Sequence, residues 1–269
     1  MSAMPRLGLG TWEMGDDPAR RAAEVAALRT GLDLGLSMID TAEMYGAGRA
    51  ERLVGEAIAG RRDEVFLVTK VLPENASAKG VVAACERSLS RLATDRVDLY
   101  LLHWPGSHPI AETVAGLERL VAQGKALRWG VSNLDVEDLE AMAAAPDGAN
   151  CAANQVYYNL AHRTAERRVI PWCRARGVTV QAYTPLDQGR LAASGVVKKV
   201  AARHGVAASA IALAWAMRED GAVAIAKTGR AARAREFAAT LTVKLTADDL
   251  RELDVAFPPP AQDSPLETI

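Results

Sequence analysis

A repeated alternation of short apolar runs with longer helical patterns constrains the fold of this chain more than any other feature. Eight runs are typical of strands, at Arg6–Leu9, Ser37–Asp40, Val65–Lys70, Leu99–His103, Leu127–Val131, Cys151–Val156, Thr179–Tyr183 and Ala222–Ala226. Helical patterns fall at Ala19–Leu34, Glu51–Ala59, Ala78–Leu92, Ile110–Gln123, Val136–Ala145, Glu166–Arg176, Val196–Met217 (long enough for two helices), Ala232–Leu241 and Ala247–Ala256. Because the strands are mostly continuous apolar runs, they indicate a parallel sheet covered by helices.

Eight such strands with intervening helices predict an α/β fold, a single (β/α)8 TIM barrel. The length of 269 residues agrees with the about 250 residues typical of this fold. No linker-like stretch divides the chain, so we expect one domain over residues 1–269. From Phe257 onward, prolines followed by polar residues predict an extended C-terminal tail over residues 257–269. A doubly wound open sheet is the alternative, and periodicity alone does not decide between the two.

The composition excludes several classes of protein. Hydrophobic residues make up 49% of the chain and the formal net charge is −1, so there is no basic excess of the kind that binds nucleic acid. No apolar run approaches the length of a membrane span, and the N-terminus lacks a secretion signal. Cys85, Cys151 and Cys173 are too few and too widely spaced for a disulfide framework or a zinc site. We therefore expect a cytoplasmic protein, a monomer, with no membrane, nucleic-acid or metal partner.

Polar side chains gather where the predicted strands end. Seven successive strands carry or precede one: Asp40, Lys70, His103, Ser132 with Asn133, Gln155, Tyr183 and Lys227. In a parallel barrel these ends share one face, and active sites are built there. One polar residue after an apolar strand is unremarkable, but seven in succession predict a site.

Three of these side chains and a loop neighbour suggest proton delivery to an oxygen that gains charge. Tyr45 lies in the loop after Asp40, and a free phenol has a pKa near 10. We expect the ammonium of Lys70 to lower that pKa, Asp40 to orient Lys70, and His103 to donate a hydrogen bond to a carbonyl oxygen. Taken singly, the four could be a turn cap, a loop aromatic, a surface lysine and a buried histidine; their joint placement favours catalysis.

These residues carry a family resemblance. The segments Leu7-Gly8-Leu9-Gly10-Thr11-Trp12, Asp40-Thr41-Ala42-Glu43-Met44-Tyr45-Gly46, Val68-Thr69-Lys70, Asp98-Leu99-Tyr100-Leu101-Leu102-His103-Trp104-Pro105, Gly130-Val131-Ser132-Asn133 and Asn154-Gln155-Val156 resemble the aldo-keto reductases, in that family's order. The resemblance implies a catalytic tetrad at Asp40, Tyr45, Lys70 and His103. It implies reduction of a small carbonyl substrate by NADP(H), with Trp12 and Trp104 beside Tyr45 and His103 in the substrate pocket.

The resemblance also implies how the cofactor lies. Ser132, Asn133 and Gln155 would bind the nicotinamide carboxamide, and Tyr183 would stack on the ring. The remaining contacts would come from Thr11, Trp12, Asp40 and Glu236, and from Thr184, Pro185, Leu186 and Gln188 along the pyrophosphate path.

The segment after the eighth strand would hold the adenosine end of the cofactor. Lys227, Thr228 and Arg233 suit a 2′-phosphate, which favours NADPH over NADH. Two residues depart from the family pattern: Ala226 replaces a proline, and Phe237 replaces an asparagine that would bind adenine. The family's N-terminal hairpin is expected to be missing or reduced, and the short tail is expected to leave the pocket open.

Three other functions compete with this interpretation. A Rossmann dinucleotide site is rejected because Glu13 occupies the third glycine position of the fingerprint begun by Gly8-Leu9-Gly10. A cofactor-binding regulatory barrel subunit with little turnover is the main alternative, because such subunits can keep the tetrad. A metal-dependent hydrolase is disfavoured because His103, His108, His162 and His204 show no ligand spacing.

Overall fold

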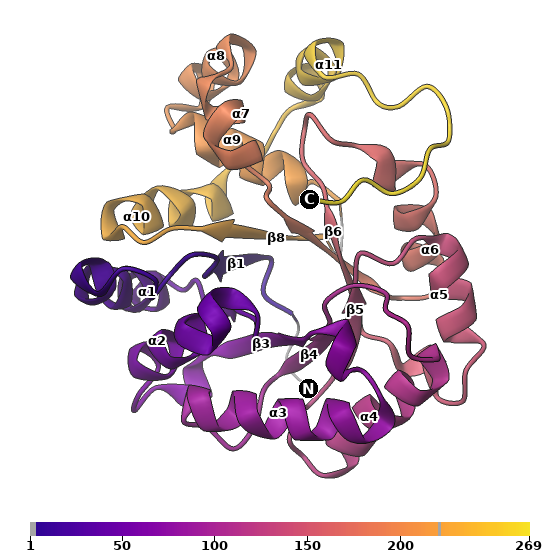
Figure 1. Cartoon of the computed structure of the whole chain (residues 1–269). Helices are drawn as coiled ribbons and strands as arrows, with labels where there is room; N and C mark the ends of the chain where they lie inside the picture. Colours follow the sequence, from indigo (N-terminus) through magenta and orange to yellow (C-terminus); the bar gives the residue numbers. More distant parts are fainter. Residues whose placement is uncertain (1–3, 220–221) are drawn as a thin grey trace.

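Eight parallel strands close into a barrel in the computed structural model, which describes residues 4–219 and 222–269 (Figure 1). The strands are β1 (Leu7–Gly10), β2 (Met38–Asp40), β3 (Phe66–Val71), β4 (Leu99–Leu102), β5 (Trp129–Ser132), β6 (Ala153–Tyr157), β7 (Thr179–Tyr183) and β8 (Ala222–Lys227). The last strand closes the ring by pairing with the first, in a register that sets Gly10 beside Lys227. This closure confirms the predicted (β/α)8 barrel and excludes the open sheet.

Helices surround the strands and cover their outer faces. They are α1 (Arg21–Asp33), α2 (Arg49–Ala57), α3 (Ala78–Leu92), α4 (Ile110–Ala122), α5 (Val136–Ala143), α6 (Val169–Ala175), α7 (Arg190–Ala193), α8 (Gly195–His204), α9 (Ala208–Ala216), α10 (Ala231–Ala239) and α11 (Ala247–Ala256). The prediction of two helices within Val196–Met217 is confirmed by α8 and α9.

Element boundaries differ from the sequence predictions by one to three residues in several places. His103 follows β4 rather than ending it, and Lys227 ends β8 rather than following it. The helix predicted from Glu166 begins at Val169, because residues 164–166 form a separate 3-10 turn. Pro171 then lies in the first turn of α6, where its missing N–H is tolerated.

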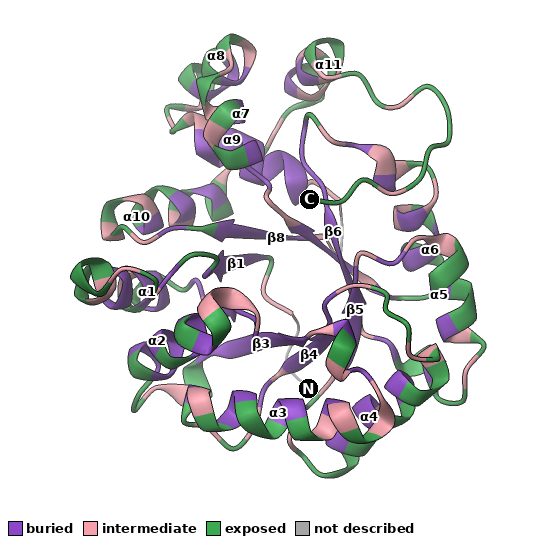
Figure 2. Cartoon of the chain, in the orientation of Figure 1, coloured by how far each residue is buried: buried purple, intermediate pink, exposed green. Residues whose placement is uncertain are grey.

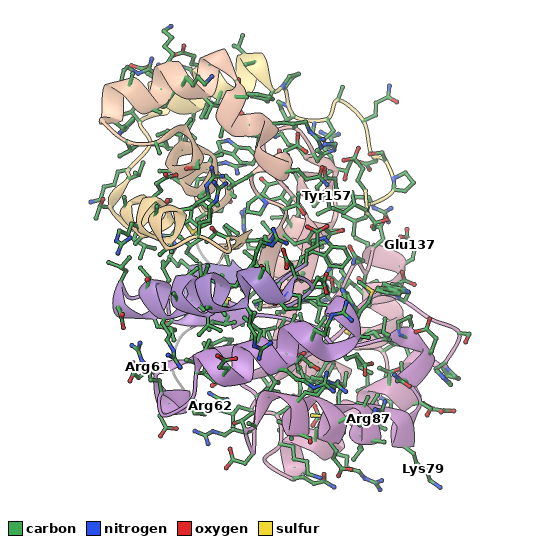
Figure 3. All side chains as sticks on the ribbon, turned by 60° about the vertical axis from the view of Figure 1, so that its left-hand side comes forward. Arg61, Arg62, Lys79, Arg87, Glu137 and Tyr157 are labelled. Atoms are coloured by element: carbon green, nitrogen blue, oxygen red, sulfur yellow. The ribbon has the colours of Figure 1, made fainter. Side chains whose placement is uncertain are left out.

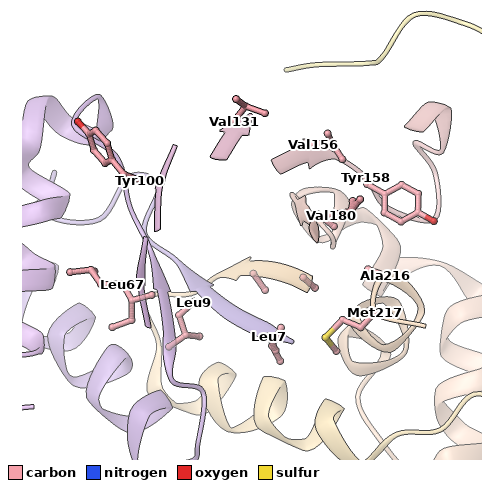
Figure 4. Close-up of a cluster of buried hydrophobic side chains, with 14 of the residues drawn as sticks. Leu7, Leu9, Leu67, Tyr100, Val131, Val156, Tyr158, Val180, Ala216 and Met217 are labelled. Atoms are coloured by element: carbon pink, nitrogen blue, oxygen red, sulfur yellow. The ribbon is translucent and has the colours of Figure 1, made fainter. Parts of the chain in front are cut away.

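Successive side chains along each strand point alternately outward to the helices and inward to the barrel interior, which divides the core into two layers. Outward side chains such as Leu7, Leu9, Tyr100 and Val180 pack beneath the helices (Figure 4). The inward apolar side chains form a separate cluster inside the barrel: Met38, Phe66, Val68, Leu99, Leu101, Ala153, Val223 and Ile225. Figure 2 shows the resulting pattern, with buried strands and, in most helices, a buried face toward the strands, whereas α9 is buried nearly throughout. The same parity turns Lys70 inward, because it lies two residues after Val68.

The barrel interior is tight enough to require glycine in β1. A Cβ at Gly8 would lie 2.8 Å from the Met38 Sδ, closer than van der Waals contact allows.

The outer surface of the protein is polar: Lys79 on α3 and Glu137 on α5 point into solvent (Figure 3). None of the helices in residues 4–219 and 222–269 is long and apolar enough to cross a membrane. Cys85, Cys151 and Cys173 are buried free thiols.

Helix α11 begins with a reciprocal cap formed by Thr246 and Asp249. The Thr246 hydroxyl accepts a hydrogen bond from the Asp249 N–H at 3.1 Å, and the Asp249 carboxylate accepts one from the Thr246 N–H at 2.9 Å. This reciprocal capping box satisfies two backbone donors at the helix start. The Asp249 carboxylate also accepts hydrogen bonds from Arg203 and pairs with His204, both on α8, so one side chain fixes α11 against α8.

The C-terminal tail has no regular secondary structure, as predicted, but it is tied to the barrel. After α11 it turns back toward the strands (Figure 1). The Leu266 N–H donates to Asp135 at 2.9 Å, and the Glu267 carboxylate lies 2.9 Å from His162 Nδ1. The tail therefore ends beside the carboxyl ends of the strands, and the expectation that it leaves the pocket open stays a prediction.

Candidate active site

The four side chains predicted to form a tetrad meet at the carboxyl end of the barrel. Asp40 ends β2, Lys70 lies one residue before the end of β3, and His103 follows β4. Tyr45 begins a short turn in the loop after β2. Since all strands are parallel, these positions share one end of the barrel.

Lys70 connects three of these groups. Its Nζ donates to Asp40 Oδ1 at 2.6 Å, to the Thr41 carbonyl at 2.9 Å and to the Tyr45 hydroxyl at 3.2 Å. An ammonium group has three donors and no acceptor, so these contacts use its whole capacity. Lys70 is fully buried, and only a paired ammonium is tolerated at such a position.

The loop that carries Tyr45 is fastened to β3. The Thr41 N–H donates to the Val68 carbonyl at 2.9 Å, and the Glu43 N–H donates to the Lys70 carbonyl at 3.3 Å. The Glu43 carboxylate in turn accepts from the Leu72 N–H at 2.8 Å. These contacts extend the register between β2 and β3 past the strand end, so the phenol is placed by backbone rather than by side-chain packing alone.

A second buried charge network contacts the outward face of β3. The Thr69 hydroxyl, which points outward, donates to Glu51 on α2 at 2.7 Å. Arg91 on α3 donates to the other Glu51 oxygen at 2.5 Å. Sequence reasoning missed this support, because buried charges on helix faces give no periodic signal.

Burial dominates the acidity of the Tyr45 phenol. Burial raises the pKa of Tyr45 above its ordinary value; the charge of Lys70 lowers it and that of Asp40 raises it. The predicted effect of Lys70 therefore has the right sign, but the prediction of a net lower pKa is wrong. For Lys70, burial favours the neutral amine, yet the charges of Asp40 and Tyr45 raise its pKa on balance. At neutral pH the site holds an intact phenol beside an ammonium.

His103 is an uncharged imidazole. Burial, with a smaller contribution from Lys70, lowers the pKa of His103 to about 2. Its Nδ1 is buried without a partner among the described residues. The ring lies 5.8 Å from the Tyr45 ring and 4.7 Å from Trp104, between centroids. A neutral histidine here can donate one N–H to a substrate oxygen without carrying charge.

Aromatic side chains border the tetrad. Trp12 packs edge-on against Tyr45, with ring centroids 5.0 Å apart, although half of its surface is exposed. Trp104 is half-buried beside His103. Thr11 is fully buried, and its hydroxyl donates to the Asp40 carbonyl at 2.9 Å. This hydrogen bond helps to fix the backbone at Asp40.

The residues expected to bind the nicotinamide form an interlocked set. Ser132 Oγ donates to the Gln155 carbonyl at 2.8 Å, and Tyr183 donates to Asn133 Oδ1 at 2.9 Å. Gln155 Nε2 donates to Asp40 Oδ2 at 2.9 Å. Asn133 holds a left-handed backbone with φ of 60°, which asparagine adopts more readily than most residues. The structure thus brings these predicted residues together beside the tetrad.

The loop after β7 runs past this set in a strained conformation. Thr184, Asp187 and Gln188 all have φ near +50°, a region that non-glycine residues rarely occupy. Asn159 Nδ2 donates to the Thr184 carbonyl at 3.1 Å. Pro185 and Leu186 are buried, whereas Gln188 is exposed. Strain of this kind concentrates where a protein must hold a ligand.

The predicted phosphate-binding residues lie at the end of β8 and the start of α10. Lys227 is exposed and lies 4.0 Å from the Glu13 carboxylate, while the Thr228 hydroxyl accepts from the Arg230 N–H at 3.1 Å. Arg233 is half-buried in the first turn of α10, and Glu236 is exposed on the same helix. Arg230 adds a third cation that the sequence interpretation omitted.

The two departures from the family pattern lie next to this loop. Ala226 is buried within β8, and Phe237 is buried in the core with no exposed surface. Phe237 therefore points away from the surface on which an adenine would lie.

We also searched the described residues for a metal site and for other cavities. In the part of the chain that the structure describes, no three histidine, cysteine or acidic side chains gather so that they could hold a metal ion. A cavity of about 580 Å³ lies outside the barrel, lined by Tyr158, Arg163, Val180 and Leu250 among others. It shares none of the predicted site residues.

Known proteins match the chain over nearly its whole length. The aldo/keto reductase family model matches residues 6–256. Methylglyoxal reductase YeaE of Escherichia coli (strain K12) is 47% identical over 272 residues, covering 99% of this chain and 96% of that protein. Glyoxal reductase of Bacillus subtilis (strain 168) is 31% identical over 255 residues, covering 93% and 88%. An aldo/keto reductase from Klebsiella pneumoniae, solved with NADP and acetate, superposes with a TM-score of 0.97 at 46% identity, covering 100% and 96%. The chain therefore belongs to the aldo/keto reductase family.

Proposed function

We propose that this protein reduces small 2-oxoaldehydes, the class that includes methylglyoxal, with Tyr45 as the proton donor. The chain is an NADPH-dependent oxidoreductase that converts carbonyl groups to alcohols. Two relatives are named for methylglyoxal and glyoxal, which supports the narrower substrate class. The alternative of a regulatory barrel subunit finds no support among these relatives, which are named as reductases.

The observation that carries the proposal is the three-way bridge at Lys70. Its ammonium touches both the Asp40 carboxylate and the Tyr45 hydroxyl, next to a neutral His103. The Thr41 carbonyl accepts the third ammonium hydrogen and Gln155 donates to Asp40, so this buried pair is held in place at the mouth of the barrel.

Each residue has a distinct part in the reaction. Bound NADPH supplies the hydride that the carbonyl carbon receives. His103 donates an N–H to the carbonyl oxygen and orients it. Tyr45 transfers its proton to that oxygen as negative charge develops there, and Lys70 stabilises the phenolate that remains. Asp40 holds Lys70 in place through the 2.6 Å contact.

The chain offers groups that fit each part of NADPH. The amides of Asn133 and Gln155 match a carboxamide, and the half-buried ring of Tyr183 offers a flat face on which a nicotinamide can stack. A phosphate is matched by the cations Lys227, Arg230 and Arg233, because a guanidinium can form bidentate hydrogen bonds with phosphate oxygens. We also propose a cytoplasmic monomer that binds no nucleic acid.

A substrate screen tests the proposal. The loss of NADPH absorbance would be followed with methylglyoxal, glyoxal, acetone and propanal as substrates. We expect kcat/KM to be highest for the two dicarbonyls. Equal kcat/KM for propanal would contradict the 2-oxoaldehyde class, and no turnover with any carbonyl would contradict the assigned roles of the tetrad.

A further inference from the structure

Gln181 is a buried amide within the barrel that no part of the reaction yet uses. It lies in the middle of β7 and points inward with no exposed surface. The register sets it directly beside Gln155 on β6. A primary amide in this interior needs hydrogen-bond partners to offset its loss of water.

Both ends of the Gln181 amide are satisfied. Its Oε1 accepts from Gln155 Nε2 at 2.9 Å, and its Nε2 lies 3.1 Å from the Met4 Sδ, a weak acceptor. Gln181 is thereby held so that its carbonyl faces Gln155. These hydrogen bonds form a chain inside the barrel that leads from Met4 through Gln181 and Gln155 to Asp40.

The contact decides which atom of Gln155 remains available. One of its two N–H hydrogens goes to Asp40 Oδ2 and the other to Gln181 Oε1, both at 2.9 Å. A side-chain amide has only these two donors, so Oε1 is what the residue can still offer. No group in residues 4–219 or 222–269 donates to that oxygen, and it is not sealed from solvent.

We propose that Gln181 is a positioning residue that fixes the amide plane of Gln155, so that Gln155 Oε1 accepts from the carboxamide NH2 of the nicotinamide. Asp40 alone would hold one hydrogen and leave the amide free to rotate about its terminal bond. Two bonds on opposite sides of one nitrogen remove that rotation. The inference rests on the proposed function, because it assumes that the nicotinamide lies beside Gln155.

A cofactor analogue separates this role from plain packing. In the 3-acetylpyridine analogue of NADPH, a methyl group replaces the carboxamide NH2, so Gln155 Oε1 has no hydrogen to accept. Dissociation constants of NADPH and the analogue would be measured by fluorescence titration. We expect the wild-type protein to prefer NADPH about tenfold, the value of one hydrogen bond.

The Gln181→Met variant keeps the side-chain volume and removes the acceptor. We expect its preference for NADPH to fall to about threefold or less, with the analogue's dissociation constant unchanged within about twofold. Leu101→Met, inside the same barrel, is the matched control and should keep the wild-type preference. A tenfold preference in Gln181→Met would overturn the inference.

Two further measurements keep the inference testable. Gln155→Met should also lose the preference; if it does while Gln181→Met does not, only the role of Gln181 fails. If Gln155→Met keeps the preference, the carboxamide contact in the proposed function fails instead. In the wild-type protein, NMR should show Gln155 side-chain amide protons that exchange slowly with water, and exchange as fast as in an exposed glutamine would contradict the two bonds.

Discussion

Tyr45 combines two properties that a proton donor needs at neutral pH. It keeps its proton, because burial raises its pKa, and it touches an ammonium that favours the phenolate once the proton has left. Tyr45→Phe removes the donor and leaves the cofactor contacts. We expect turnover to fall about 10²–10⁴-fold, with the dissociation constant of NADPH unchanged. Tyr100→Phe, buried on the outer side of β4, is the control, and steady-state kinetics would measure both. Turnover near the wild-type value in Tyr45→Phe would remove the residue from its role.

Lys70 acts through Tyr45, so its loss should appear in the pH dependence as well as the rate. Lys70→Met removes the charge and hydrogen bond that lower the phenol's pKa. We expect activity to fall by at least tenfold and the basic limb of the pH–rate profile to move to higher pH. Lys79→Met changes an exposed lysine and should alter neither. A basic limb at the wild-type position in Lys70→Met would show that the two groups are not coupled.

Asp40, Lys70 and His103 could be predicted because they lie at strand ends, and position along a strand can be read from an apolar run. Tyr45 lies in a loop, and the family resemblance added it to the set. The sequence did not predict the net pKa of Tyr45, which depends on burial and not on spacing. Gln181 escaped notice for a related reason. A single glutamine within an apolar strand gives no signal until the register shows that it faces Gln155.

At the scale of elements, we predict that the connection from β8 to α10 sets the preference for NADPH over NADH. Lys227 ends β8 and Arg233 lies in the first turn of α10, where the helix N-terminus adds amide donors. A hydrogen bond to a charged group contributes about 1.5–3 kcal/mol. Arg233→Ala should therefore weaken NADPH binding by about ten- to a hundredfold and leave NADH binding nearly unchanged. Fluorescence titration of both cofactors, with Arg235→Ala on the same helix as control, would measure this. Equal weakening of both would mean that Arg233 supports the fold instead.

Helix α11 should depend on pH through Asp249. Hydrogen bonds from Arg203, His204 and Thr246 outweigh burial and hold the pKa of Asp249 well below its usual range. A carboxyl whose pKa is lower in the folded state contributes stability above its unfolded pKa of about 3.9, and that contribution is lost as pH falls toward the folded pKa. Asp249→Asn should cost about 1.5–3 kcal/mol at pH 7 and progressively less as the pH falls from about 4 toward the folded pKa.

Urea unfolding of Asp249→Asn and wild type at several pH values would check this, with Asp248→Asn, an exposed neighbour, as control. A difference in unfolding free energy that did not vary with pH would contradict the linkage. The capping box itself was readable from the sequence, since Thr246 and Asp249 have the right spacing. The four-residue helix α7 was not, because one turn carries no periodicity.

For the whole molecule, eight predicted strands favoured the barrel, but they left an open parallel sheet as the alternative. The pairing of β8 with β1 decides between the two. The path of the tail was not predictable, because it depends on single contacts such as Leu266 to Asp135. The organisation as one domain over residues 1–269 stays a prediction.

We predict that the protein is a monomer. Among the described residues, the large apolar side chains that are exposed outside the site belong to separate elements, as with Leu34, Leu127, Leu241 and Val255, whereas a stable interface needs a continuous patch. We expect light scattering to give a mass near 28.6 kDa with and without NADPH. A mass twice as large would contradict this prediction.

The course of the tail also determines which end of the chain is better suited for attaching a tag, a fluorophore or a solid surface. Burial raises the pKa of Tyr183 to about 12, and the backbone of Ile269 is near enough to that hydroxyl to oppose the shift. A purification tag, fluorophore or surface linker joined after Ile269 would thus emerge beside the mouth of the barrel. Residues 4–6, just ahead of β1, lie at the opposite end of the strands. Immobilisation through that end would leave the mouth facing the solution, which suits a biosensor or a packed-bed reactor.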